Sequence, residues 1–170
     1  MENQATIPEL VNINGSVVNQ DLITTFKSSI GGKVITPRDS GYDNARKIWN
    51  ASIDRYPGII ACCSGVADVM AAVNFGREYE LLVAVKGGGH NVGGRAICDG
   101  GIVIDLSGMK GIHVDSIKRT ARVQGGATLG DVDRETHVFG LAVPTGVISK
   151  TGIGGLTLGG VSAGWVENMD

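Results

Sequence analysis

The first half of the chain carries apolar residues at the spacing of helix faces. Apolar positions within residues 22–30 predict a short helix in the otherwise polar segment 1–40. A second apolar series predicts a helix over residues 42–53. Its members are Tyr42, Ala45, Ile48, Trp49, Ser52 and Ile53.

A strand–helix–strand unit is predicted over residues 58–86. Residues 59–63 form an apolar run of strand length, and Ser64 can cap the helix that follows. One face of this helix carries Val69, Met70 and Val73. Residues 81–85 are continuously apolar, which predicts a strand buried on both faces.

The second half of the chain predicts mainly strands and turns. Residues 101–106 have the composition of a strand, and residues 112–114 and 120–124 alternate like an antiparallel pair. Residues 128–131 match a capping box, and Gly140 would end the helix that it opens. That helix would place four residues on one stripe: Leu129, Val132, Thr136 and Phe139.

Length and charge narrow the class of protein. The 170 residues suit one domain, or one domain and part of another, and the apolar share of 42% is enough for a core. A net charge of −2 and a pI of about 5.9 supply no basic field for nucleic acid or an anionic membrane. No apolar run reaches the roughly 18 residues of a membrane span, and the polar start is unlike a signal peptide.

The cysteines and histidines indicate a reducing compartment and no metal site. Cys62, Cys63 and Cys98 are odd in number and two are adjacent, which predicts free thiols in a cytoplasmic chain. The three histidines and the cysteines lack the spacing of metal ligands.

Glycine is in large excess, with 27 residues concentrated after residue 86. Three clusters, residues 87–94, 125–130 and 152–160, each follow a predicted strand or turn. They are either tight turns or loops whose backbone N–H groups converge on phosphate oxygens. The spacings match neither the dinucleotide-binding GxGxxG pattern nor the P-loop, so a large anionic ligand would be held differently.

Two further features suggest chemistry. Residues 160–164 fit the GxSxG nucleophile elbow of hydrolases, but no histidine follows them, so this hypothesis is weak. His90 stands inside the densest glycine run. There it is either a surface residue or an imidazole nucleophile that suits covalent attachment of a cofactor.

Five ordered motifs, spread over about 75 residues, resemble the N-terminal flavin domain of FAD-linked oxidases of the vanillyl-alcohol-oxidase and berberine-bridge-like type. The motifs occupy residues 83–91, 99–106, 122–131, 140–146 and 152–160. The resemblance implies an FAD site between two α+β lobes, with an N-terminal extension at 1–40, a first lobe at 41–115 and a partial second lobe at 116–170.

The resemblance also implies which residues hold the cofactor. His90 would carry a covalent bond to the 8α carbon of the flavin, and residues 87–91 would hold the pyrophosphate. A second bond, which some relatives make through cysteine, is not expected because Ile148 stands at that place. The expected cofactor-binding residues are Lys86, Gly87, Gly88, Gly89, His90, Asn91, Thr128, Leu129, Gly130, Asp131, Pro144, Thr145, Gly146, Gly154, Gly155, Thr157 and Gly159.

The same resemblance predicts that the chain is a shortened form. Relatives complete the second lobe and add a substrate domain, which we expect to be missing here. Such a chain would leave strand edges and apolar faces uncovered, which predicts a homo-oligomer. Two functions therefore stay open: a flavin-dependent oxidoreductase acting on a small molecule, or an inactive remnant that serves as an interaction module.

Overall fold

The centre of the molecule is a four-stranded sheet in a computed structural model that describes residues 7–159. The order across the sheet is β1 (Lys33–Ile35), β2 (Ile59–Cys62), β4 (Ile102–Asp105) and β3 (Val83–Lys86). β4 is parallel to both of its neighbours, and β1 is antiparallel to β2. The predicted strand–helix–strand unit is therefore confirmed, with β4 placed between its two strands.

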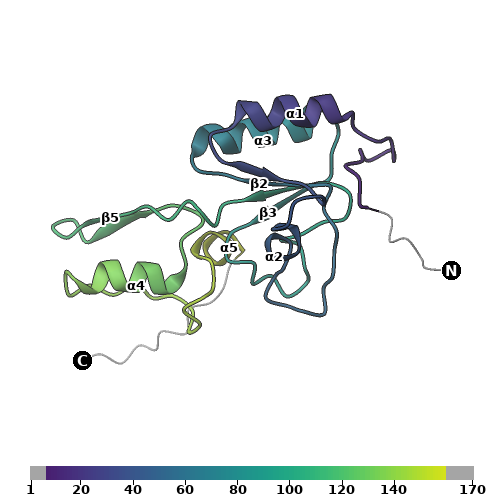
Figure 1. The fold of residues 1–170 in the computed structure, drawn as a ribbon. Coiled ribbons are helices and arrows are strands. Elements are labelled where there is room, and N and C mark those ends of the chain that lie inside the picture. The colour runs from purple at the N-terminus through teal and green to yellow at the C-terminus, as the bar shows by residue number, and fades with distance from the viewer. Residues whose placement is uncertain (1–6, 160–170) are drawn as a thin grey trace.

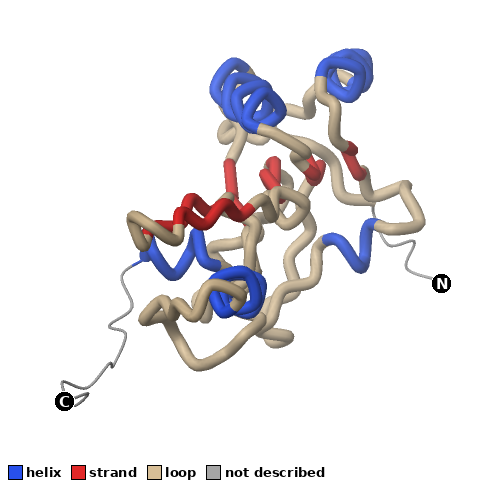
Figure 2. Tube along the Cα trace, turned by 90° about the vertical axis from the view of Figure 1, so that its left-hand side faces the viewer, coloured by secondary structure: helices blue, strands red, loops and turns tan. Residues whose placement is uncertain are grey.

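Two layers cover this sheet. Helices α1 (Gln20–Ser29) and α3 (Val66–Glu78) lie together on one face, where Phe26 stacks on Phe75 with ring centroids 4.3 Å apart (Figure 1). The short helix α2 (Tyr42–Ala45) and long loops cover the other face, across the strands from α1 and α3 (Figure 2). The predicted helix near residues 22–30 is confirmed.

The two central strands are buried on both faces because their alternate side chains enter two different cores. Ile59 and Ile102 pack under α1 and α3, whereas Ile60 and Val103 pack under the loops. All four are fully buried. The apolar runs predicted around residues 59–63 and 101–106 are therefore confirmed as core strands.

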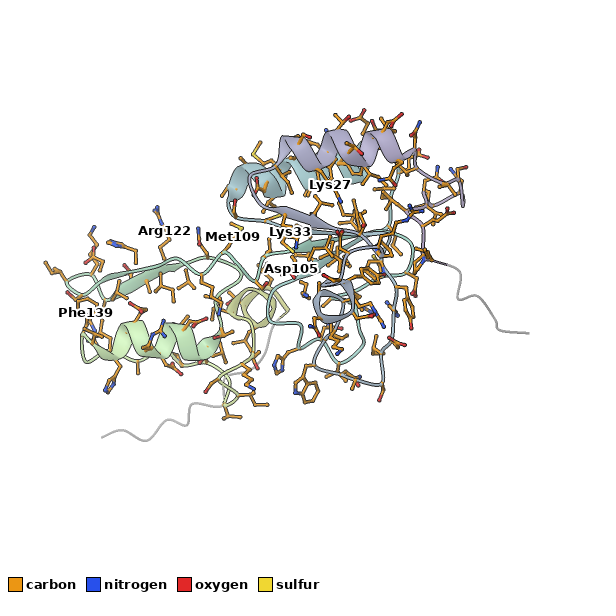
Figure 3. The ribbon with its side chains drawn as sticks, in the orientation of Figure 1. Lys27, Lys33, Asp105, Met109, Arg122 and Phe139 are labelled. Atoms are coloured by element: carbon orange, nitrogen blue, oxygen red, sulfur yellow. The ribbon has the colours of Figure 1, made fainter. Side chains whose placement is uncertain are left out.

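The second region extends from the sheet as a hairpin and two helices. Strands β5 (Ile112–Asp115) and β6 (Thr120–Val123) pair antiparallel, as predicted. Helix α4 (Leu129–His137) opens with the predicted capping box of Thr128 and Asp131, and α5 (Ile153–Gly159) follows a long loop. Phe139 lies beyond the end of α4 and is half exposed, so it is not part of the predicted stripe (Figure 3).

The helix predicted over residues 42–53 is wrong after Ala45. A helix that continued through Trp49 would join the Trp49 N–H to the Ala45 carbonyl, and both groups have other partners. The Lys86 ammonium donates to the Ala45 carbonyl at 2.5 Å, and the Trp49 N–H donates to the Gly89 carbonyl at 3.1 Å. Tertiary contacts with the sheet and the glycine loop thus end the helix.

Two other predictions about burial are wrong. Strand β3 is at the sheet edge, so Val83 and Val85 are exposed on the face that α1 and α3 cover elsewhere. On α3 the predicted apolar face is mostly exposed. The buried side chains of that helix belong to Asp68, Ala72 and Phe75, with Gly76 against Val83.

Asp68 explains why α3 turns this face inward. Its carboxylate accepts hydrogen bonds from the backbone N–H and hydroxyl of Ser64 and from the N–H groups of Gly31 and Gly32, at 2.7–2.9 Å. Ser64 therefore binds Asp68 instead of capping the helix, whose N-cap is Gly65. These donors, with the Ser64 backbone foremost, lower the pKa of Asp68 to about 2.

Candidate functional site

The site is built where two parallel strands end side by side. Lys86 closes β3 and Asp105 closes β4, and their side chains form an ion pair of 2.8 Å that is almost fully buried. The Asp105 carboxylate also accepts the Ser107 N–H at 2.8 Å. The two charges compensate each other, so the ion pair beneath the loop that follows Lys86 carries no net charge. Figure 3 shows Asp105 at the middle of the molecule.

The loop of residues 87–91, here called the glycine loop, exposes unused hydrogen-bond donors. Within residues 7–159, the backbone N–H groups of this loop donate to no acceptor. Gly89 has a φ of +68°, in the left-handed region that favours glycine, and its carbonyl is bound by Trp49. Consecutive free N–H groups of this kind are suited to bind anionic oxygens.

Several glycines are required by contact between the two regions of the fold. A Cβ on Gly88 would overlap the backbone of Gly152, and a Cβ on Gly152 would overlap Gly88. A Cβ on Gly126 would overlap the carbonyl of Leu106. Glycine therefore lets the loops of the second region lie backbone to backbone against the glycine loop.

A positively charged cavity of about 390 Å³ opens on one side of the glycine loop. Its four lysines are not equivalent, because Lys86 is paired with Asp105 and Lys110 with Asp131. Lys47 and Lys150 have no carboxylate partner among the described residues. The lining residues are Lys47, Ile48, Trp49, Lys86, Gly87, Gly88, Gly89, His90, Ser107, Lys110, Gly126, Thr128 and Lys150.

A second cavity of about 470 Å³ shares the glycine loop. Its walls include the apolar side chains of Val85, Val92, Ala96 and Leu156, the cation Arg95, and Gly155 and Gly159 of α5. His90 lines both cavities, so it lies at the boundary between them.

Trp49 covers His90. The indole and imidazole rings are stacked, with centroids 5.3 Å apart and planes inclined by 18°. The Trp49 side chain is 58% exposed, so it contributes little to either core.

The predicted site residues of segment 128–131 have structural partners. Leu129 is fully buried, and the Gly130 N–H donates to the Ser149 carbonyl. The Asp131 carboxylate accepts the N–H and hydroxyl of Thr128 and lies 3.1 Å from the Lys110 ammonium. The hydrogen bond from the Thr128 backbone N–H, and after it the contacts with Lys110 and the Thr128 hydroxyl, lower the pKa of Asp131 to about 2. Of these four residues, Thr128 also lines the cationic cavity.

The remaining predicted residues do not all meet at the glycine loop. Pro144, Gly154 and Thr157 line a third cavity of about 630 Å³, between the hairpin, α4 and α5. Gly146 packs against Leu129 and Leu156. The side chain of Asn91 turns back to accept the Arg95 N–H. The role of these residues in cofactor binding, and of Thr145, stays a prediction.

Sequence reasoning missed Trp49, Lys47, Lys110 and Lys150. The only available signal was the apolar Trp49 within the helical spacing of residues 42–53, and that spacing indicated a core residue. The GxSxG match at residues 160–164 lies outside the described residues.

Two classes of feature are missing from the described residues. Between residues 7 and 159, no group of three or more His, Cys, Asp and Glu side chains is arranged to hold a metal ion. The same stretch has no helix with the length and apolar character that crossing a membrane requires.

Known proteins with similar sequences include FAD-linked oxidoreductases. Residues 57–169 match the family model described as FAD binding domain. An FAD-linked oxidoreductase of Dictyostelium discoideum is 43% identical over 140 residues, which is 82% of this chain and 30% of that protein. (R)-6-hydroxynicotine oxidase of Paenarthrobacter nicotinovorans is 43% identical over 132 residues, 78% of this chain and 29% of the oxidase.

Solved structures give the same result. The crystal structure of 6-hydroxy-D-nicotine oxidase from Arthrobacter nicotinovorans has a TM-score of 0.74 at 43% identity, covering 75% of this chain and 28% of that one. BBE-like 1 of Physcomitrella patens has a TM-score of 0.72 at 25% identity, covering 79% and 29%. The chain thus spans less than a third of the length of these relatives. Because the family model matches most of the chain and the relatives align with its mixed α+β fold, the chain belongs to the FAD-binding domain family of the FAD-linked oxidoreductases, and its cofactor is FAD.

Proposed function

We propose that this chain holds the flavin of an oxidoreductase in which a small-molecule substrate gives a hydride to FAD and dioxygen reoxidises the cofactor. The observation that supports this function is the glycine loop, whose free N–H groups adjoin two cavities, both of which contain cationic side chains. FAD supplies the redox chemistry, and the chain binds and orients it.

The chemistry of the two cavities fits the two ends of such a cofactor. The N–H groups of residues 87–91 and the uncompensated ammonium groups of Lys47 and Lys150 suit the doubly charged pyrophosphate. In the second cavity, Val85, Val92 and Leu156 offer apolar contact for a flat ring system, and Arg95 adds a cation beside it.

His90 is proposed to bind the flavin covalently through its 8α carbon. In the net reaction an imidazole N–H and one C–H of the 8α methyl group are replaced by an N–C bond. Dioxygen takes up the two hydrogens and becomes hydrogen peroxide. His90 suits this role because it lies where the two cavities meet.

An absorbance spectrum of the purified chain, repeated after acid precipitation, tests these proposals. We expect a flavin band that remains in the pellet, and in His90→Ala a band that is released to the supernatant. Flavin that stays fixed to the His90→Ala variant would contradict the assignment of His90.

The alternative is an inactive remnant that binds flavin weakly or not at all, and the same spectrum separates it from the proposed function. A chain with no flavin band, even after incubation with FAD, would support an interaction module. The identity of the substrate is not part of the proposal, since the chain spans about 30% of the length of relatives such as the hydroxynicotine oxidase.

We also propose that copies of the chain associate. Leu82, Val83 and Val85 at the edge strand β3 are 41–54% exposed, and an uncovered strand edge favours pairing with another strand. Sedimentation velocity should show a dimer that Val85→Lys dissociates. A monomer at every protein concentration would exclude association.

The proposed compartment is the reducing cytoplasm. Cys62, Cys63 and Cys98 are free thiols, and burial raises the pKa of Cys63 and of Cys98 to about 11. Fractionation of cells that express the chain tests this proposal, and recovery in a secreted fraction would overturn it.

A further inference from the structure

Trp49 is exposed and packs into neither hydrophobic core, so its placement beside His90 has another explanation. The Trp49 side chain is 58% exposed, and the helix that would have turned it inward ends at Ala45. Its contact with His90 is a parallel stack of two flat rings. The stack covers one face of the imidazole, and neither ring nitrogen is hydrogen-bonded to another described residue.

The backbone around Trp49 is fixed to the glycine loop on both sides of His90. The Trp49 N–H donates to the carbonyl of Gly89, directly before His90, at 3.1 Å. The side-chain amide of Asn50 donates to the carbonyl of Val92, two residues after His90, at 2.9 Å. These two bonds hold the backbone that carries the indole beside the loop that carries the imidazole.

The start of this segment is anchored as firmly. Lys86 donates to the Ala45 carbonyl, and the guanidinium of Arg46 binds Asp43 and Asp54 and lies 4.1 Å from the centre of the Tyr56 ring. The segment from Ala45 to Asn50 is thus bound at one end to Lys86 and at the other to the glycine loop and Val92. Its one aromatic side chain, the exposed Trp49, stacks on His90.

We propose that Trp49 is a positioning residue that holds the imidazole of His90 in one orientation, with its nitrogen-bearing edge directed into the cofactor space. The purpose of this orientation rests on the proposed covalent bond to the flavin. A stacked ring loses rotation about its side-chain bonds before the cofactor arrives, so less ordering is needed when the bond forms. Trp49 would thereby speed bond formation without touching the reacting atoms.

The first arm of the test needs no cofactor. In proton NMR spectra, the ring current of an indole moves the ring protons of a stacked imidazole upfield. We expect the His90 ring signals to lie upfield of those of the exposed His113 and His137. Trp49→Leu should remove the displacement and Trp49→Phe should keep part of it.

Phe139→Leu, at a half-exposed aromatic residue remote from the site, is the matched control and should change nothing at His90. His90 signals that are the same in the wild type and in Trp49→Leu would overturn the proposal.

The second arm measures the rate at which flavin becomes stable to acid, at saturating FAD. We expect Trp49→Leu to slow this rate by about tenfold or more and Trp49→Phe to restore most of it. If Trp49 only contacts the bound cofactor, its loss will raise the FAD concentration needed for half-saturation and leave the saturated rate unchanged, which overturns the positioning role.

The two proposals fail in different ways. A wild-type chain that never acquires acid-stable flavin contradicts the covalent bond, and the NMR arm then still decides whether Trp49 orients His90. Equal saturated rates in the wild type and Trp49→Leu, with acid-stable flavin in both, contradict the positioning role alone.

Discussion

The sheet region and the hairpin region of this chain are stabilised in different ways. In the sheet region, β2 and β4 are buried on both faces, and a buried ion pair joins the ends of β3 and β4. In the hairpin region, β5 and β6 are partly or fully exposed along their length, and α4 buries only three side chains. The first region therefore has its own core, whereas the second depends on its backbone contacts with the glycine loop.

The largest expected effect breaks the buried ion pair of the sheet region. Lys86→Met leaves the Asp105 carboxylate buried without its cation, which should lower the free energy of unfolding by about 3–5 kcal/mol. The matched control is Lys118→Met, since Lys118 forms an exposed pair with Asp115 at 3.4 Å in the hairpin. That loss should stay below about 0.5 kcal/mol. Urea denaturation measures both, and equal losses would contradict the contrast between the regions.

A smaller effect comes from removing the same two methyl groups in each region. Val103→Ala empties space in the fully buried β4 and should lower the free energy of unfolding by about 2 kcal/mol. Val114→Ala in the partly exposed β5 should cost less than about 1 kcal/mol. If thermal melting shows the larger loss for Val114, the hairpin has a core of its own and the comparison fails.

The smallest effect concerns acid. The folded pKa of Asp68 is about 2, below its ordinary 3.8, so its stabilising effect is complete above pH 3.8 and is lost as the pH falls toward 2. We expect this loss to be about 1–2 kcal/mol and to be missing in Asp68→Asn. Denaturation at a series of pH values measures it, and an unchanged pH dependence in the variant would contradict it.

The two regions should differ in how salt alters this acid response. Asp131 also has a folded pKa of about 2, but part of its stabilisation comes from the half-exposed Lys110, which salt screens. Asp68 is held by uncharged donors within a buried site. Added salt should therefore reduce the loss of unfolding free energy at low pH by the same amount in the wild type and in Asp68→Asn, because both keep the pair of Lys110 and Asp131.

Most of the sheet was predictable from the sequence, because β2 and β4 are short, continuously apolar runs, and such runs are typical of strands buried on both faces. The hairpin and the capping box of Thr128 were predictable because both depend on residues that are near in sequence. The edge position of β3 was not, since an apolar run does not reveal which strand later lies beside it. The end of α2 depends on Lys86 and Gly89, which lie some forty positions further along the chain.

The candidate site shows the same division. The glycine clusters and His90 were found from local composition, and the glycine loop does present free N–H groups. The reason for several glycines was not found, because Gly88 and Gly152 are needed for contact with each other. Trp49, Lys47 and Lys150 belong to other segments, and only the folded chain brings them to the loop.

The position of β4 has a consequence for the order of events during synthesis. β4 lies between β2 and β3 but follows both in the chain, so the parallel sheet cannot close until residue 105 has left the ribosome. Until then Ile59, Ile60 and Ala84 lack their hydrogen-bonding neighbour, and α3 has no complete surface to cover. A nascent chain that stalls before β4 would therefore present one open edge of β2 and the whole of β3 to chaperones.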